Sequence, residues 1–228
     1  MKPLTLALAL ALCGCMEGGS PAGESSPLPG PPAATYVPLV NHTFFPLVPG
    51  SHWTLDGDED GLPKREEVRV LPDPHMILGV RCTAVVEDVY VDGELIETTT
   101  TWFAQDTDGN VWRFGEESLD FDGGAPIPSE DSWRAGMDGK RAWIFLAAAP
   151  EVGDVYAGNR GDGWDQNEVL SVTAVAAVPA GGFAGCLDIE ETNPDDPDDL
   201  DRILYGPGVG RVSEVSSTGV VQLTSFGS

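Results

Sequence analysis

The feature that most limits the fold of this chain is its repeated division into short β-type segments by turn residues. Residues 82–91 are rich in β-branched side chains and end at Asp92-Gly93, and residues 94–104 follow with four consecutive threonines. An Asp-Gly pair between two such segments favours a type I′ hairpin, because both central positions of that turn need positive φ. A second turn at residues 106–109 leads into residues 110–114. The spacing therefore predicts three consecutive antiparallel strands.

The rest of the body repeats this pattern, and no long segment has the apolar spacing of a helix. We expect an all-β, mostly antiparallel domain over residues 35–228, with about eight to eleven strands. A barrel, a half-barrel and a sandwich all fit the pattern, because strand period does not distinguish them. The later expected strands are residues 141–146, 168–178, 182–191, 202–205, 211–215 and 220–226.

The first residues carry an export signal. Lys2 precedes a Leu- and Ala-rich stretch of signal-peptide length, too short to span a membrane as a helix. It ends in Leu12-Cys13-Gly14-Cys15, which resembles the bacterial lipobox, with a small residue just before the acylated cysteine. We expect residues 1–14 to be a lipoprotein signal peptide and Cys15 to be acylated. An ordinary secretory signal without acylation is the alternative.

Residues 15–34 predict a tether between the acylated Cys15 and the body. Twelve of the 18 residues from 17 to 34 are Gly, Ser or Pro, so the segment has too little apolar surface to offset the entropy of ordering it. We expect an exported protein anchored by its acyl chains to the outer membrane, or to the external face of the cell membrane. Met16 gives no inner-membrane retention signal of the Asp type.

Charge limits the partners that this chain can have. It contains 37 acidic and 12 basic residues, for a formal net charge of −25 at pH 7. Binding to nucleic acid depends on clustered Lys and Arg, so we expect no nucleic-acid partner. The expected partners are a lipid bilayer, through the acyl anchor, and an unidentified protein or small apolar ligand.

One acidic segment matches the pattern of a calcium-binding loop. Asp56, Asp58 and Asp60 alternate, Gly61 follows, and Glu67 occupies the position that closes the shell in an EF-hand. An EF-hand needs a helix on each side, whereas the flanking residues predict strands. Two interpretations follow: an acidic hairpin tip, or calcium held in a non-helical loop. No other cofactor is expected.

Besides the acylated Cys15, the cysteines that remain after processing are Cys82 and Cys186, and both fall in expected strands. Because export permits oxidation, we expect a disulfide between them. The alternative is two buried free thiols that act as small apolar groups.

Two further motifs predict no specific function. The acidic run at residues 195–201 has no ordered ligand spacing, so we expect a solvated loop. Arg160-Gly161-Asp162 matches an integrin-type tripeptide, but three residues match by chance too easily to assign a function.

Catalytic motifs are weak. His42, His52 and His75 lack metal-ligand spacing, and no G-x-S-x-G elbow is present. We therefore expect no enzymatic activity. A hydrolase whose Ser, His and carboxylate come from distant positions is the alternative, because such triads are recognised by geometry.

The segment WFAQDTDGNVWRFGE, at residues 102–116, resembles the signature of an uncharacterised group of bacterial secreted proteins and lipoproteins. Residues 45–50 with Trp53, and residues 205–210, resemble the same group. The resemblance covers most of the body and implies an exported, mostly β domain, without an assigned activity.

These features together predict a membrane-anchored bacterial lipoprotein whose extracytoplasmic β domain acts as a binding or interaction module. A half-barrel that encloses an apolar ligand is one form of this prediction, by analogy of fold. A module stabilised by calcium through Asp56, Asp58, Asp60 and Glu67 is the alternative.

Overall fold

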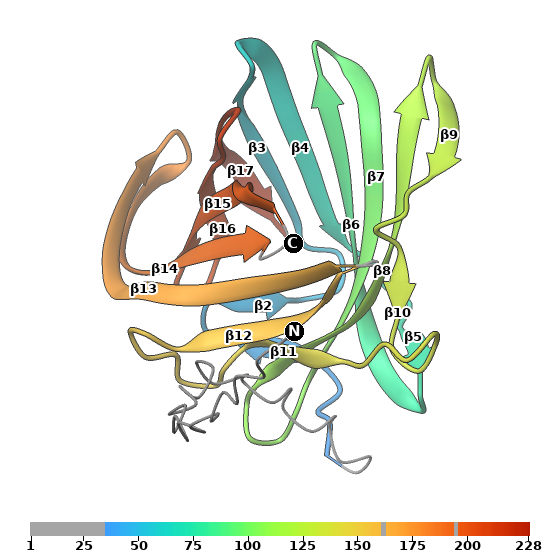
Figure 1. The fold of residues 1–228 in the computed structure, drawn as a ribbon. Coiled ribbons are helices and arrows are strands. Elements are labelled where there is room, and N and C mark those ends of the chain that lie inside the picture. Colours follow the sequence, from blue (N-terminus) through green and yellow to red (C-terminus); the bar gives the residue numbers. More distant parts are fainter. Residues whose placement is uncertain (1–34, 161–162, 194–195) are drawn as a thin grey trace, which may run out of the picture.

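The computed structural model describes residues 35–160, 163–193 and 196–228 (Figure 1). The regular structure in these ranges consists of β-strands. These ranges contain no helix that is long and apolar enough to cross a membrane. Fifteen strands form one antiparallel sheet, and two form a separate ribbon. The predicted all-β, antiparallel class is confirmed. The expected signal peptide, Cys15 and the tether lie outside the described residues.

The predicted meander is present as three long strands, β6 (Val80–Val91), β7 (Glu94–Gln105) and β8 (Val111–Asp122). Asp92 and Gly93 join the first two with φ of 51° and 84°, as a type I′ turn requires. The hairpin of β3 (His52–Glu59) and β4 (Leu62–Val70) lies beside β6. These strands stand upright in Figure 1.

The second half of the sheet continues from β3 through the C-terminal strand, β17 (Gly219–Gly227). From β17 the sheet runs through β16, β15, β14 and β13 to β12. In Figure 1, β12 and β13 run across the view, whereas the strands of the first half stand upright, so the sheet curls strongly. The bounds of these strands are Gly210–Val215 for β16, Asp196–Gly206 for β15, Gly181–Asn193 for β14, Gly163–Val178 for β13 and Val155–Arg160 for β12.

The two ends of the curled sheet meet through a side chain. β11 (Trp143–Leu146) pairs with β8 on one side and contacts β12 on the other, with no ladder to β12 among the described residues. Gly158 of β12 makes this contact possible, because a Cβ there would lie 1.9 Å from the Trp143 ring. The sheet is therefore an open half-barrel, one of the predicted architectures, and is not a closed barrel.

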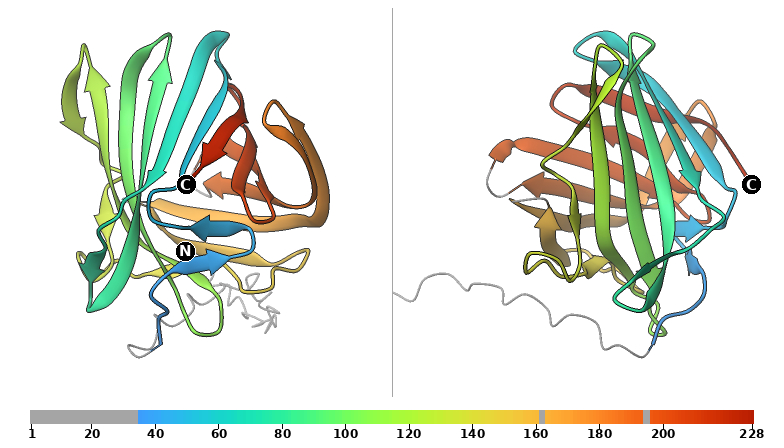
Figure 2. Two further views of the ribbon diagram at one scale, coloured as in Figure 1. Left: turned by 180° about the vertical axis from the view of Figure 1, so that it is seen from behind. Right: turned by 90° about the vertical axis from the view of Figure 1, so that its right-hand side faces the viewer.

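A short ribbon lies inside the curl (Figure 2). It consists of β1 (Val40–His42) and β2 (Phe45–Leu47). The Phe45 ring lies 4.9 Å from Phe103 of β7 and 6.1 Å from Tyr205 of β15, measured between centroids. The ribbon thus packs against both halves of the sheet and completes the core.

The described residues form 17 strands, more than the eight to eleven expected. The excess comes mainly from short pieces whose few residues show no clear alternation. Besides the ribbon these are β5 (His75–Ile77), β9 (Ala125–Pro128) and β10 (Trp133–Arg134), which pair with β6 or β8.

The acidic run was expected to be a solvated loop, and that prediction is wrong for residues 196–199. They belong to β15, because the hairpin with β14 extends to the pair Asn193–Asp196, with a register shift after the pair Thr192–Leu200. Asp195 lies outside the described residues, as do Gly161 and Asp162 of the Arg160-Gly161-Asp162 tripeptide.

The predicted disulfide is not formed, since Cys82 and Cys186 are both buried free thiols. Their strands, β6 and β14, are separated in the sheet by β4, β3, β17, β16 and β15. The Cys82 Sγ lies 3.7 Å from the Val80 carbonyl oxygen, and the Cys186 Sγ lies 3.6 Å from that of Phe183. Each thiol thus packs as a small apolar group beside its own strand.

Candidate functional site

The residues expected to bind calcium lie on the β3–β4 hairpin. Asp56 and Asp58 belong to β3, Asp60 starts the turn, and Glu67 belongs to β4 opposite Thr54. This places the segment in an acidic hairpin tip between two strands.

Asp56 is already engaged by protein groups. Arg65 Nε donates to its Oδ1 at 2.7 Å, and Thr224 Oγ1 donates to its Oδ2 at 2.8 Å. The hydrogen bond from Arg65 holds the pKa of Asp56 below its usual value. In the part of the chain that the structure describes, no three His, Cys, Asp or Glu side chains gather as a metal site would need.

The histidines have structural surroundings. His42 Nε2 donates to the Ala147 carbonyl oxygen at 3.0 Å, and its Nδ1 accepts from the Phe44 N–H at 3.2 Å. Burial lowers the pKa of His42, so the ring is neutral. His75 stacks on Trp102 with 5.0 Å between centroids, and His52 is exposed at the start of β3.

The segment behind the family resemblance builds a rigid turn. Asp106 Oδ1 accepts from the Asn110 N–H at 2.8 Å, and its Oδ2 accepts from Asn110 Nδ2 at 2.9 Å and Trp112 Nε1 at 2.8 Å. Asn110 Oδ1 in turn accepts from the Ala148 N–H at 3.0 Å. These bonds fix the β7–β8 connection to the segment after β11, and they account for this part of the motif structurally.

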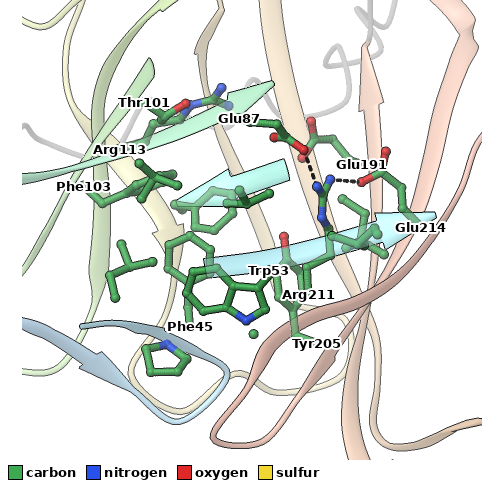
Figure 3. Close-up of a pocket in the computed structure, with 18 of the residues that line it drawn as sticks. Phe45, Trp53, Glu87, Thr101, Phe103, Arg113, Glu191, Tyr205, Arg211 and Glu214 are labelled. Atoms are coloured by element: carbon green, nitrogen blue, oxygen red, sulfur yellow. Dashed lines mark hydrogen bonds and ion pairs between the residues drawn. The ribbon is translucent and has the colours of Figure 1, made fainter. Parts of the chain in front are cut away.

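A cavity of about 270 Å³ lies on the hollow side of the half-barrel (Figure 3). Its lining comes from β2, β3, β4, β6, β7, β8, β11, β14, β15 and β16, so it draws on both halves of the sheet. Two parts of the lining differ in chemistry. We call them the aromatic floor (Phe45, Trp53, Phe103, Phe145 and Tyr205) and the charged wall (Glu87, Arg113, Glu191, Asp201, Arg211 and Glu214).

The aromatic floor is held in place by mutual ring contacts. Phe103 and Phe145 lie 5.2 Å apart between centroids, and Tyr205 lies 6.1 Å from Phe45. Trp53 Nε1 donates to the Val209 carbonyl oxygen at 2.7 Å, which fixes the indole in one orientation. Such contacts leave a rigid apolar surface facing the cavity.

Arg211 is the centre of one end of the charged wall. Its guanidinium donates to Glu66 Oε2 at 2.6 Å, to Glu214 Oε2 at 2.5 Å and to Glu87. Lys64 Nζ lies 3.2 Å from Glu66 Oε1 and supplies a further positive charge behind the wall. Burial alone would lower the pKa of Arg211, but the carboxylates outweigh it and raise the pKa, so Arg211 stays charged.

Arg113, the other arginine of the wall, is also engaged by carboxylates. Its Nη2 donates to Glu116, and its Nη1 donates to Asp165 Oδ2 at 3.1 Å. The guanidinium lies 6.0 Å from the centroid of Trp143. Both guanidiniums are therefore paired with carboxylates, and the buried Arg113 Nε–H is left without an acceptor among the described residues.

Glu191 is the carboxyl group of the wall that has no such partner. It lies on β14, in register with Asn167 of β13 and Asp201 of β15. No hydrogen bond or ion pair to Glu191 occurs among the described residues. Burial, followed by the charges of Asp165, Glu214 and Asp201, outweighs Arg113 and raises the pKa of Glu191 to about 8.

The charged wall was not predicted from the sequence, although one signal was present. On β14, buried Leu187 and Ile189 alternate with period two, and Glu191 is the next residue in that series. On β15, Asp201 precedes Ile203 and Tyr205 in the same way. An acidic residue that continues an inward apolar series is the pattern that could have located the wall.

Comparison with protein-family models and with curated proteins gives no match. Among solved structures, the chain is similar to a crystal structure from Parabacteroides distasonis, provisionally classed as a lipoprotein, with 12% identity and a TM-score of 0.44. The alignment covers 82% of this chain and 99% of the other. A likeness of this degree supports no inference about function.

Proposed function

We propose that this protein is a lipid-anchored, extracytoplasmic binding module whose half-barrel holds a small ligand in its interior cavity. The cavity carries the proposal: it combines a rigid aromatic floor with a few polar groups, one of them, Glu191, with a strongly raised pKa. Ligand sites are mostly apolar hollows with a few placed polar groups, and strongly shifted pKa values gather at functional sites.

The composition of the lining favours binding over hydrolysis, the alternative that the sequence left open. A Ser-His-carboxylate hydrolase needs its histidine and nucleophile to face the same pocket. The lining of this cavity includes neither His nor Ser among the described residues. The carboxylates of the wall are placed to attract and orient a ligand.

Cavity size favours a small ligand. A volume of about 270 Å³ lies just below the range of roughly 300 to 1,000 Å³ typical of sites for drug-sized molecules. A compound with one ring and a short chain is therefore the appropriate probe, and a long acyl chain is not.

Ligand binding is tested by filling the cavity. Val85 lines it and is buried, so Val85→Phe should occupy part of the volume at a modest cost in stability, about 1 to 3 kcal/mol. We expect calorimetric binding of a one-ring probe, 2-phenylethylammonium or 2-phenylethanol, to wild type but not to Val85→Phe. The matched control is Val175→Phe, on an exposed position of β13. Equal binding by all three proteins would contradict the cavity as the site.

The lipid anchor in the proposal is supported by the lipobox-like residues up to Cys15 and by the composition of residues 15–34. Labelling cells with a radioactive fatty acid should label the protein, and Cys15→Ser should abolish both label and membrane association. If the protein is unlabelled and released into the medium, the lipid anchor is wrong. Ligand binding by the cavity is then still tested by the calorimetry above.

A further inference from the structure

We propose that the ligand of this cavity is an amphipathic cation, an apolar one-ring body that carries a protonated amine. The inference rests on the proposed function, because it names the ligand class for the same cavity. The observation that supports it is that both arginines of the wall are paired with carboxylates, whereas Glu191 is not paired with a cation among the described residues.

Acidic groups outnumber basic groups in the wall. Its described members are four carboxyl groups and two arginines. Arg211 is shared among Glu66, Glu87 and Glu214, and Arg113 is shared between Glu116 and Asp165. Both arginines are thus paired with other carboxyl groups, and in the described part of the chain Glu191 is left without an ion pair of its own.

An anionic ligand does not fit this arrangement. The Arg113 Nε–H has no acceptor among the residues that the structure describes, but its guanidinium is already paired with Glu116 and Asp165. An anion would also enter a region where acidic groups are in excess, so repulsion would oppose it. A neutral ligand would leave the ionised form of Glu191 without a countercharge. An ammonium group would instead donate charge-assisted hydrogen bonds to the carboxylate, which are the stronger kind.

A second acceptor lies beside Glu191. The Oδ1 atom of Asn167 is buried and has no hydrogen-bond donor among the described residues, and Asn167 is the register partner of Glu191. A primary ammonium has three N–H donors and no acceptor, so it matches the two oxygen acceptors of Glu191 and Asn167.

The aromatic floor provides for the apolar part of the ligand. Along β15, Tyr205 belongs to the floor, Asp201 belongs to the wall, and Ile203 lies between them. Alternate residues of a strand lie about 6.6 Å apart, so Asp201 lies two such steps, about 13 Å, from Tyr205, and a one-ring body with a two-carbon chain and an amine fits between the floor and the wall. Rings in the floor also attract a cation through their faces.

Glu191 gives the binding a characteristic pH dependence. The groups that face it are Asp165 from β13, Arg113 from β8, Glu214 from β16, and Asp201 and Tyr205 from β15. Because the pKa of Glu191 is raised to about 8, the free protein holds a proton there at neutral pH. An amine would displace that proton, so affinity should increase as the pH rises from 6 to 8.

The test is calorimetry on the full chain carrying Cys15→Ser, with three probes of similar shape: 2-phenylethylammonium, neutral 2-phenylethanol and anionic 3-phenylpropanoate. We expect the cation to bind at least about tenfold more tightly than the alcohol at pH 8, the factor that corresponds to about 1.4 kcal/mol. At pH 7 its binding heat should depend on the ionisation enthalpy of the buffer, because close to one proton is released.

Two variants on one strand sharpen the test. Glu191→Gln should lose the preference for the cation and the proton release while still binding the alcohol. Glu190→Gln is the control, because Glu190 neighbours Glu191 but lies on the other face of β14, in register with Arg202 of β15. Both variants must give the wild-type circular dichroism spectrum. The buffer dependence of the binding heat is measured on the protein with Glu191 in place, so it tests the inference even if a variant does not fold.

Each other outcome overturns a defined statement. If the alcohol or the acid binds as tightly as the amine, or a folded Glu191→Gln keeps the tenfold preference, the cation inference is wrong and the binding module stands. If none of the three probes binds, the proposed function fails with it.

Discussion

The aromatic floor and the charged wall of the cavity lie next to each other but differ in what they do for the protein. In the floor, Phe45, Phe103 and Phe145 contact one another, so removing them from water stabilises the fold. In the wall, burial of Arg211 and Glu191 works against their charged forms. The difference indicates that the floor stabilises the folded state, whereas burying the charged groups of the wall lowers the free energy of unfolding.

The largest effect is expected in the floor. Phe103→Ala should lower the free energy of unfolding by about 3 to 5 kcal/mol, because Phe103 is buried between Phe45 and Phe145. Urea denaturation measures this. The control is Phe226→Ala, since Phe226 is 47% exposed and should cost much less. Equal losses would show that the floor is not a special part of the core.

Removing the central cation of the wall should have the next largest effect. Arg211→Met leaves Glu66 buried and Glu87 and Glu214 without their partner, so we expect a loss of about 3 kcal/mol at pH 8. The unfolded chain ionises these carboxyl groups near pH 4.5, whereas the variant keeps them protonated to higher pH, so its stability falls as the pH rises. The loss should therefore be small at pH 4.

The matched control for this variant is Arg65→Met, which breaks an ion pair with Asp56 at the surface. The Arg65 side chain is about half exposed, so its removal should cost less than about 1 kcal/mol at either pH. A pH-independent loss in Arg211→Met would mean that packing, and not charge, explains its effect.

A change in the opposite direction is expected for Glu191. Its pKa is about 8 in the folded protein and about 4.5 in the unfolded chain, so wild-type stability falls between these pH values. Glu191→Gln removes this loss and should raise the free energy of unfolding at pH 9, with little change at pH 4.5. Thermal melts at the two pH values measure the gain. A destabilised variant at pH 9 would show that the carboxylate contributes to folding.

The smallest effect concerns acidic residues outside the cavity. Calcium at millimolar concentration should shift the melting temperature by less than about 1 °C, because both oxygens of Asp56 are engaged by Arg65 and Thr224. A rise of several degrees that Asp56→Asn abolishes would instead support the calcium-stabilised module. The β3–β4 hairpin would then be a second place, besides the charged wall, where acidic groups bind a cation.

The sequence predicted the fold class correctly because its signals are local. The turn at Asp92-Gly93 depends on the φ preferences of two residues, and the strands on either side depend on a two-residue period. The disulfide prediction was wrong because a disulfide depends on tertiary structure. Whether Cys82 and Cys186 can meet depends on the order of strands between β6 and β14 in the sheet, and local sequence signals do not give that order.

By itself, the sequence determined an antiparallel β body and the places of its long hairpins. Only the tertiary structure decided that this body is an open half-barrel, because Trp143 meets Gly158 across the ends of the sheet and β17 pairs with β3. It also decided the chemistry of the cavity, since Arg113, Glu191 and Glu214 come from three strands distant in sequence. A raised pKa depends on enclosure and on neighbouring charges, and both arise only when the sheet curls.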